Sequence, residues 1–212
     1  MSDAISPKKL GFVFIGGFAD WEFGMLSASA VEYFGSEAIA LTPKALPVKS
    51  IGGFSMLGAR PLSDDSIDDL DALVVVGSDG WCDKSAPEIG PMLKAAAGRD
   101  LVVAGICAGT LPLAKAGLFA GRSHTSNGRD WIRRHLDYYP GDSQYRDVPH
   151  AVADGRIVSA PGSAPGTFAV AVLSALHPDR SDMLAGMRAT FASEYGGGIS
   201  PADKAFTADA RH

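Results

Sequence analysis

The chain has 212 residues, of which 46% are hydrophobic and 20% charged, so it can bury a large core and is too apolar to be disordered throughout. Its 19 basic and 24 acidic residues leave a net charge of −5, unlike the basic surface of a nucleic-acid-binding protein. No segment has the roughly 20 consecutive apolar residues of a membrane helix, and the first ten residues lack the apolar core of a signal peptide. We therefore expect a cytoplasmic protein with neither a membrane nor a nucleic acid as partner.

Short apolar runs alternate along the chain with segments of helical periodicity. In chain order, the sequence predicts a strand over 10–15, a helix over 20–34, a strand over 38–41, a hairpin over 48–57, a strand over 71–76, a helix over 87–97, a strand over 101–106, helices over 109–116 and 131–138, a strand over 156–160, and helices over 166–176 and 181–195. Asp20 is the expected N-cap of the first helix.

The nearly continuous apolar strands are typical of a parallel sheet that is covered on both faces. We therefore predict a single-domain α/β protein, a three-layer sandwich with a mainly parallel sheet of the flavodoxin-like type, over residues 1–195. Residues 196–212 begin with a run of three glycines and are predicted to be a C-terminal tail. Neither the spacing of a zinc site nor a phosphate-binding loop is present in the sequence, so no metal or other cofactor is expected.

The two cysteines are too few for a disulfide framework, so each is interpreted as a thiol. Cys107 lies between a predicted strand and a predicted helix, where a sharp turn raises a side chain above the carboxyl end of the sheet. The N-terminus of the helix then favours a thiolate, and we expect a lowered pKa. The alternative is a buried structural cysteine. Cys82 lies in a loop and has no evident chemical role.

The segment Ala104–Thr110, AGICAGT, resembles the nucleophile elbow of the ThiJ/PfpI superfamily, the family of DJ-one, which shares its fold with class I glutamine amidotransferase domains. Similar matches in the expected order are FADWE at 18–22, VVVGSDG at 74–80, DGRIVSA at 154–160 and GTFA at 166–169. The resemblance implies a cofactor-independent cysteine enzyme that acts on a small electrophile, as a glyoxalase, deglycase, hydratase or hydrolase. It also implies a homodimer.

Glu22 lies in the first turn of the predicted helix 20–34, on the same face as apolar residues, which directs its carboxyl group toward the core. The resemblance implies that this carboxyl contacts the sulfur of Cys107. Burial beside a thiolate would raise the pKa of Glu22 and make it a protonated hydrogen-bond donor. The alternative is an exposed glutamate that interacts favourably with the helix dipole.

The backbone N–H groups of Gly77, Ser78 and Ala108 are candidates for an oxyanion hole. The superfamily usually has two consecutive glycines at this turn, whereas Ser78 replaces the second one here. Asp79 in the same turn is a candidate pocket residue. The alternative is an ordinary turn at the end of a strand.

Many members of the superfamily have a histidine in the region that corresponds to GRSHTSN at 121–127. The resemblance therefore implies that a general base lies in this segment. The simplest alignment places Ser126 at the histidine position, and Ser126 is therefore a candidate pocket residue. His124 is two residues upstream on the same face of an extended chain and is the candidate base. Protease-like members have a histidine directly after the cysteine, where this chain has Ala108, so a peptidase is less favoured.

Two further hypotheses use the same cysteine. A non-enzymatic, stress-protective protein would respond to oxidation of Cys107 to the sulfinate. A glutaminase would need a glutamine and a His-Pro-acid element, but Leu111 stands at the glutamine position and His177-Pro178-Asp179 closes a predicted helix. The acidic residues between 64 and 71 are interpreted as a solvated turn rather than a metal site.

Overall fold

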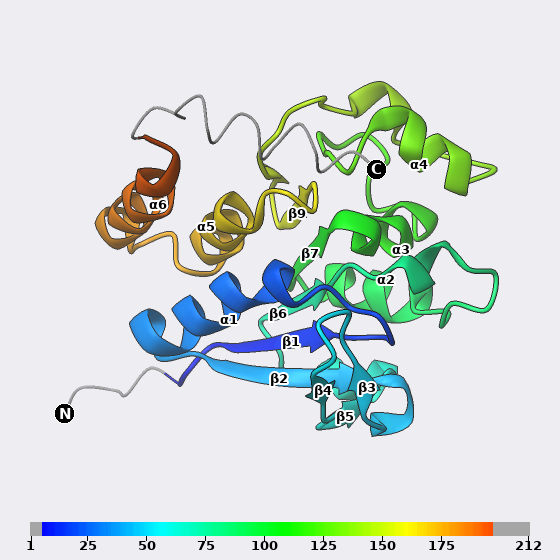
Figure 1. Cartoon of the computed structure of the whole chain (residues 1–212), viewed down its shortest axis with the longest axis horizontal. Coiled ribbons are helices and arrows are strands. Elements are labelled where there is room, and N and C mark those ends of the chain that lie inside the picture. Colours follow the sequence, from blue (N-terminus) through cyan, green and yellow to red (C-terminus); the bar gives the residue numbers. More distant parts are fainter. Residues whose placement is uncertain (1–5, 197–212) are drawn as a thin grey trace.

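The structure is a computed structural model that describes residues 6–196, with side chains described up to residue 193. Nearly all of the predicted tail, residues 197–212, lies outside the described residues. The described chain forms the predicted single α/β unit with a central, mostly parallel sheet (Figure 1).

The central sheet has seven strands in the order β5-β2-β1-β6-β7-β9-β8. Their bounds are β1 Lys9–Val13, β2 Glu37–Thr42, β5 Arg60–Pro61, β6 Ala72–Val75, β7 Val102–Ile106, β8 Val152–Asp154 and β9 Ile157–Ala160. All neighbouring strands are parallel except β8 and β9, which pair antiparallel. A separate hairpin pairs β3 Val48–Lys49 with β4 Ser55–Met56, as predicted. The carboxyl ends of β1, β6 and β7 therefore lie at one edge of the sheet, where side chains from the following loops can meet.

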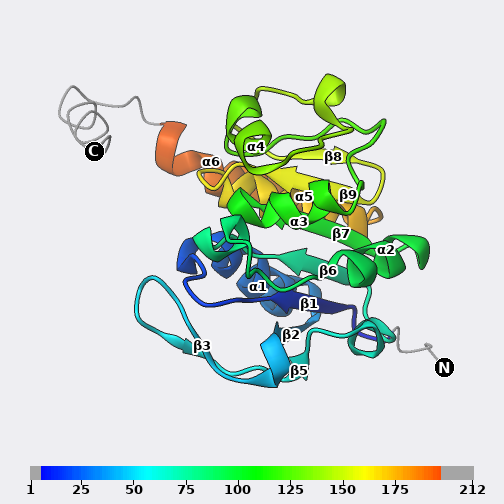
Figure 2. The same ribbon diagram turned by 90° about the vertical axis from the view of Figure 1, so that its right-hand side faces the viewer.

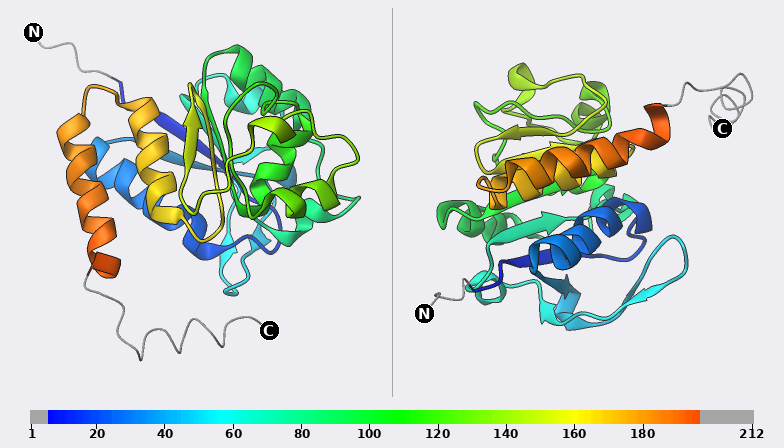
Figure 3. Two further views of the ribbon diagram at one scale, coloured as in Figure 1. Left: turned by 90° about the horizontal axis from the view of Figure 1, so that it is seen from above. Right: turned by 90° about the vertical axis from the view of Figure 1, so that its left-hand side faces the viewer.

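Helices cover both faces of the sheet. On one face lie α1 Asp20–Phe34, α5 Pro165–Leu176 and α6 Ser181–Gly196, which are the blue, gold and orange helices on one side of the sheet in Figure 3. On the other face lie α2 Gly90–Gly98 and α3 Thr110–Lys115. The short helix α4 Arg129–His135 lies on the same side as α2 and α3, which face the viewer in Figure 2, and its Ile132 belongs to the core beneath those helices.

The strands are apolar on both faces because each face packs against helices. Along β1, Phe12 packs into the core beneath α1 and α5, while Val13 packs into the core beneath α2 and α3. Val74 and Val75 in β6 divide between the two cores in the same way. This alternation follows from the two-residue period of a strand, and each fully buried side chain of this size stabilises the fold by about 1.5–3 kcal/mol.

The boundaries of several elements differ from the prediction. Asp20 is not the N-cap of α1: Ala19 occupies that position without a side-chain cap, and the Asp20 Oδ2 atom accepts a hydrogen bond of 2.9 Å from the backbone N–H of Gly52. The carboxylate therefore joins the start of α1 to the β3–β4 hairpin. The helix predicted over 87–97 begins only at Gly90, with a proline in its first turn. Strands β5 and β8 are two and three residues long, too short to give a periodic signal.

The acidic segment at 64–71 lies on the surface and is partly neutralised by basic side chains. Asp69 contacts both Lys9 and Arg60, and its carboxylate is held at low pKa by those two hydrogen bonds. Asp71 pairs with Lys8. Within the described range, no helix is long and apolar enough to span a bilayer.

Candidate active site

Cys107 occupies a sharp turn between β7 and α3, at the carboxyl edge of the sheet. Its backbone has a φ of 57°, a left-handed conformation that costs a non-glycine residue about 1–3 kcal/mol. Gly109 lets the turn pass close to the neighbouring strand, because a Cβ atom there would lie 2.3 Å from the Val75 carbonyl oxygen. The turn thus has the strained geometry of a nucleophile elbow.

Glu22 extends from the first turn of α1 into the core and has no exposed surface. Its Oε2 atom accepts a hydrogen bond of 2.7 Å from the backbone N–H of Gly77, while Oε1 has no partner of good geometry among residues 6–196. A Cβ atom placed on Gly162 would lie 3.1 Å from this Oε1 atom and 2.9 Å from the Cys107 sulfur. The free carboxyl oxygen and the sulfur therefore border the same small space in front of Gly162.

Burial governs the protonation of this carboxyl group. It raises the pKa of Glu22 to about 7, against the smaller lowering effects of the Cys107 and Gly77 hydrogen bonds. The carboxylate of Asp79 raises the pKa of Glu22 further. Glu22 can therefore hold a proton at neutral pH, as expected from the sequence.

The thiol shows the opposite of the expected shift. Burial and the neighbouring Glu22 carboxylate raise the pKa of Cys107 to about 12, whereas the N–H groups of Asn127 and Ala108 lower it. The expectation of a lowered thiol pKa is therefore wrong while Glu22 is ionised, because burial and the neighbouring carboxylate outweigh the hydrogen-bond donors at the sulfur. The two groups titrate as a coupled pair, because an ionised Glu22 raises the pKa of the neighbouring thiol.

Asn127 is the residue at the sulfur that the sequence reasoning missed. Its side-chain nitrogen donates a hydrogen bond of 3.1 Å to the Cys107 sulfur, and its Oδ1 atom accepts one of 2.9 Å from the backbone N–H of Gly162. The carbonyl oxygen of Gly162 in turn accepts a hydrogen bond of 3.0 Å from the Trp21 indole. Asn127 directly follows Ser126 in the segment 121–127. Because an amide does not titrate, the pattern of a general base gives no signal for this residue.

The three candidates for the oxyanion hole have different surroundings. The N–H of Gly77 is already used by Glu22. The N–H of Ala108 faces the sulfur and lowers its pKa. Ser78 has an extended backbone, with a φ of −159°, so no glycine is required there, and its hydroxyl donates to the Gly16 carbonyl at 2.7 Å. Gly77 is therefore positioned to hold Glu22 rather than an oxyanion.

His124 is buried away from the sulfur, contrary to the expectation that it faces the elbow. Its Nδ1 atom lies 2.8 Å from the Arg122 carbonyl oxygen, and its Nε2 atom contacts the Tyr139 hydroxyl. The ring stacks on Phe119 at a centroid distance of 4.2 Å, and burial lowers its pKa. Both ring nitrogens are engaged, so the structure does not place His124 as a base for Cys107.

The two candidate pocket residues occupy different positions. The Ser126 hydroxyl lies 2.6 Å from the Thr110 hydroxyl, which donates to the Cys107 carbonyl oxygen at 2.6 Å. Ser126 therefore contacts the elbow indirectly, through the hydroxyl group of Thr110. Asp79 is exposed and acts on the site through its charge, which raises the pKa of Glu22.

The comparisons identify the family. A family model described as DJ-1/PfpI matches residues 8–175. The chain belongs to the DJ-1/PfpI family. A curated relative in Bacillus subtilis, "Uncharacterized protease YoaZ", is 31% identical over 173 residues, which cover 78% of this chain and 82% of the relative.

Two solved structures of the DJ-1/PfpI family extend this similarity to the fold. A DJ-1 superfamily protein of Agrobacterium tumefaciens has 35% identity and a TM-score of 0.78, covering 89% of this chain and 99% of that protein. A ThiJ/PfpI family protein of Bacillus anthracis has 25% identity and a TM-score of 0.74, covering 90% and 92% of the two chains. The described architecture is therefore that of the DJ-1/PfpI fold.

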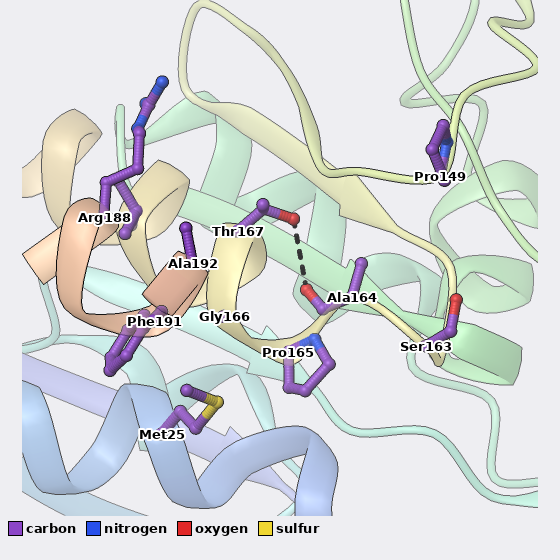
Figure 4. Close-up of a pocket in the computed structure, with 11 residues that line it drawn as sticks. Met25, Pro149, Ser163, Ala164, Pro165, Gly166, Thr167, Arg188, Phe191 and Ala192 are labelled. Carbon is purple, nitrogen blue, oxygen red and sulfur yellow. Dashed lines mark hydrogen bonds between the residues drawn. The ribbon is translucent and has the colours of Figure 1, made fainter. Parts of the chain in front are cut away.

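This DJ-1/PfpI chain also has a cavity of about 320 Å³ between α1, α5 and α6 (Figure 4). Met25, Pro165 and Phe191 are among its lining residues, and Arg188 lies at its rim. Cys107 does not line this cavity. The Cys107 sulfur is therefore not part of the cavity wall.

The remaining sequence candidates in this family member lie outside the site. His177 follows the last residue of α5 and packs on Phe34 at a centroid distance of 4.6 Å. Because α5 has twelve residues, its length of roughly 18 Å separates His177 from the elbow end of the helix. Cys82 is half-buried in a short turn, and burial raises its pKa.

Proposed function

We propose that this DJ-1/PfpI family member is a cysteine-dependent enzyme that acts on small electrophiles without a cofactor. Cys107 is the nucleophile and Glu22 carries the proton. The observation that carries this proposal is the shared position of the Glu22 Oε1 atom and the Cys107 sulfur in front of Gly162.

The surroundings of the two groups favour a thiolate beside a protonated Glu22 once the pair has lost one proton. The sulfur is partly exposed and receives N–H groups from Asn127 and Ala108. The carboxyl group is fully buried and receives a single N–H, from Gly77. A charge is less costly where solvent and more donors reach it, so the sulfur is the better site for it.

The proposed reaction with an α-oxoaldehyde such as methylglyoxal needs no external oxidant or reductant. The Cys107 thiolate forms a bond to the aldehyde carbon, the carbonyl π electrons move to oxygen, and that oxygen takes the proton of Glu22 to give a hemithioacetal. The Glu22 carboxylate then removes the proton from the same carbon, and the electron pair of that C–H bond moves toward the neighbouring carbonyl group to give an enediolate. The neighbouring carbon takes this proton back from Glu22, and its oxygen takes the proton of the hemithioacetal hydroxyl, which leaves a thioester. Water hydrolyses the thioester to a hydroxy acid and restores the thiol.

A peptidase is the function suggested by the printed name of the Bacillus subtilis relative YoaZ. Peptide cleavage requires an acid that protonates the leaving amine, and a histidine does this in most cysteine peptidases. In this chain Ala108 follows the nucleophile, Asn127 contacts the sulfur, and His124 is engaged elsewhere. The site therefore favours addition to a small carbonyl compound over peptide hydrolysis.

The proposal is tested by turnover with purified protein. Methylglyoxal, an aliphatic isocyanide and casein are offered to the wild type, to Cys107→Ser and to the matched control Cys82→Ser. We expect conversion of a small electrophile by the wild type and by Cys82→Ser, and none by Cys107→Ser. Cleavage of casein alone, or no conversion of any compound while Cys107 is intact, would contradict the proposal.

A further inference from the structure

We infer that Asn127 is a second residue that acts directly on the reacting sulfur: its amide N–H stabilises the Cys107 thiolate without exchanging a proton. Glu22 then remains the titratable side chain that serves the sulfur. This inference rests on the proposed function only in that Cys107 is the reacting group. Asn127 directly follows Ser126, which the simplest alignment with the superfamily places at the position of a histidine.

The direction of the Asn127 amide is fixed by a backbone group. The N–H of Gly162 can only donate, so the amide atom that faces it at 2.9 Å must be the carbonyl oxygen. The amide nitrogen therefore points at the Cys107 sulfur, 3.1 Å away. A donor at this distance stabilises the thiolate more than the thiol, since hydrogen bonds to charged groups are the stronger ones.

Gly162, whose N–H orients Asn127, is also held through its carbonyl group. Its carbonyl oxygen accepts a hydrogen bond of 3.0 Å from the Trp21 indole, which lies next to Glu22 in α1. The loop that carries Asn127 and the helix that carries Glu22 are thus joined through one glycine. This arrangement holds both the Asn127 amide and the Glu22 carboxyl group next to the Cys107 sulfur.

An amide and a histidine at this position would give different chemistry. Histidine changes its charge between pH 5 and 8, whereas an amide stays neutral throughout that range. Asn127 therefore lowers the pKa of the thiol without adding a second ionisation to the pH profile. Its exposed position places it on the solvent side of the sulfur, where a substrate approaches.

The test measures alkylation of Cys107 by iodoacetamide, resolved by mass spectrometry, in the wild type, Asn127→Asp and Asn127→Ala. The aspartate substitution would keep an acceptor for the Gly162 N–H but would replace the donor at the sulfur with a carboxylate oxygen. We expect its alkylation rate at pH 7 to fall by about tenfold or more, and that of Asn127→Ala to fall by a smaller factor. Cys82 in the same samples is the internal control, and its rate should not change.

The possible outcomes separate this inference from the proposed function. A wild-type Cys107 that reacts no faster than Cys82 overturns both. A fast wild-type reaction that is unchanged in both Asn127 variants, with folding verified by circular dichroism, overturns the role of Asn127 alone. The pH profile of Cys107 alkylation in Glu22→Gln is the third outcome. An ionisation between pH 5 and 8 in that profile, besides that of the thiol itself, overturns the statement that Glu22 is the side chain that titrates next to the sulfur.

Discussion

The backbone N–H of Gly77 donates a hydrogen bond of 2.7 Å to the Oε2 atom of Glu22. This contact fixes the buried carboxyl group so that its second oxygen faces the sulfur of Cys107. A side chain on Gly77 would be incompatible with it, because a Cβ atom would lie 2.2 Å from Oε2. The glycine at the end of β6 therefore determines where the proposed proton carrier points.

Glu22→Gln separates thiolate formation from proton transfer. The glutamine carbonyl would face the Gly77 N–H, so its NH₂ group would face the sulfur and act as a permanent donor. We expect turnover to fall by at least about 100-fold, because the amide cannot carry a proton, while the rate of Cys107 alkylation at pH 7 stays close to that of the wild type. A large acceleration of alkylation at pH 7 would instead show that an ionised Glu22 suppresses the thiolate in the wild type.

The raised pKa of Glu22 also predicts how stability changes with pH. Between its ordinary value of 4.5 and the folded value of about 7, the folded protein holds a proton that the unfolded chain has lost. Stability therefore falls as the pH rises through this window, by about 3 kcal/mol relative to Glu22→Gln. Urea unfolding of both proteins at pH 4.5 and pH 7.5 measures the difference. Parallel pH profiles of the two proteins would contradict the raised pKa.

Gly162→Ala tests the shared space between the carboxyl group and the sulfur. The added methyl group would lie 2.9 Å from the sulfur and 3.1 Å from the Glu22 Oε1 atom, while the backbone φ of Gly162 is outside the left-handed region. We expect alkylation of Cys107 to slow by at least about tenfold, since a tenfold change needs only about 1.4 kcal/mol of added barrier. Gly24→Ala in α1, where a Cβ atom meets nothing within 4 Å, is the matched control and should react like the wild type.

Substitution of His124 should affect stability and not thiol chemistry. His124→Ala would remove the stacking on Phe119 and leave the Tyr139 hydroxyl without its partner. We expect a loss of about 1–3 kcal/mol in the free energy of unfolding, with the alkylation rate of Cys107 unchanged. The loss is read from urea unfolding. A selective loss of Cys107 reactivity in a stable variant would restore His124 as a functional residue.

The elements that carry the site could be predicted because their signals are local. The apolar run 101–106 followed by Cys107 and small residues is a strand, a sharp turn and a helix in the structure. The position of Glu22 on the apolar face of α1 likewise predicted a buried carboxyl group. Period and spacing predicted these elements, whereas the resemblance to the superfamily was needed to favour a contact between Glu22 and Cys107 over an exposed glutamate.

The partners of these two residues could not be predicted, because they depend on contacts between distant loops. Asn127 is 20 residues from the sulfur that it contacts and 35 from the glycine that orients it. Same-face spacing placed His124 near the elbow, but its ring is held by Arg122 and Tyr139. The search for a titratable base also favoured a histidine over an amide. The raised pKa of the thiol has a similar cause, since it depends on burial and on the Glu22 carboxylate from a distant part of the chain.

The central claim is that Cys107 and Glu22 share one proton near neutral pH, with the charge on the sulfur. The most direct measurement is the rate of Cys107 alkylation by iodoacetamide between pH 5 and 10, with Cys82 as the reference thiol. We predict a rate that rises with a midpoint at or below about pH 7, because the sulfur must ionise before the Glu22 carboxyl group, whose pKa is about 7. A Cys107 that stays unreactive until the pH approaches about 9 or higher would show that the proton remains on the sulfur, and would contradict this account.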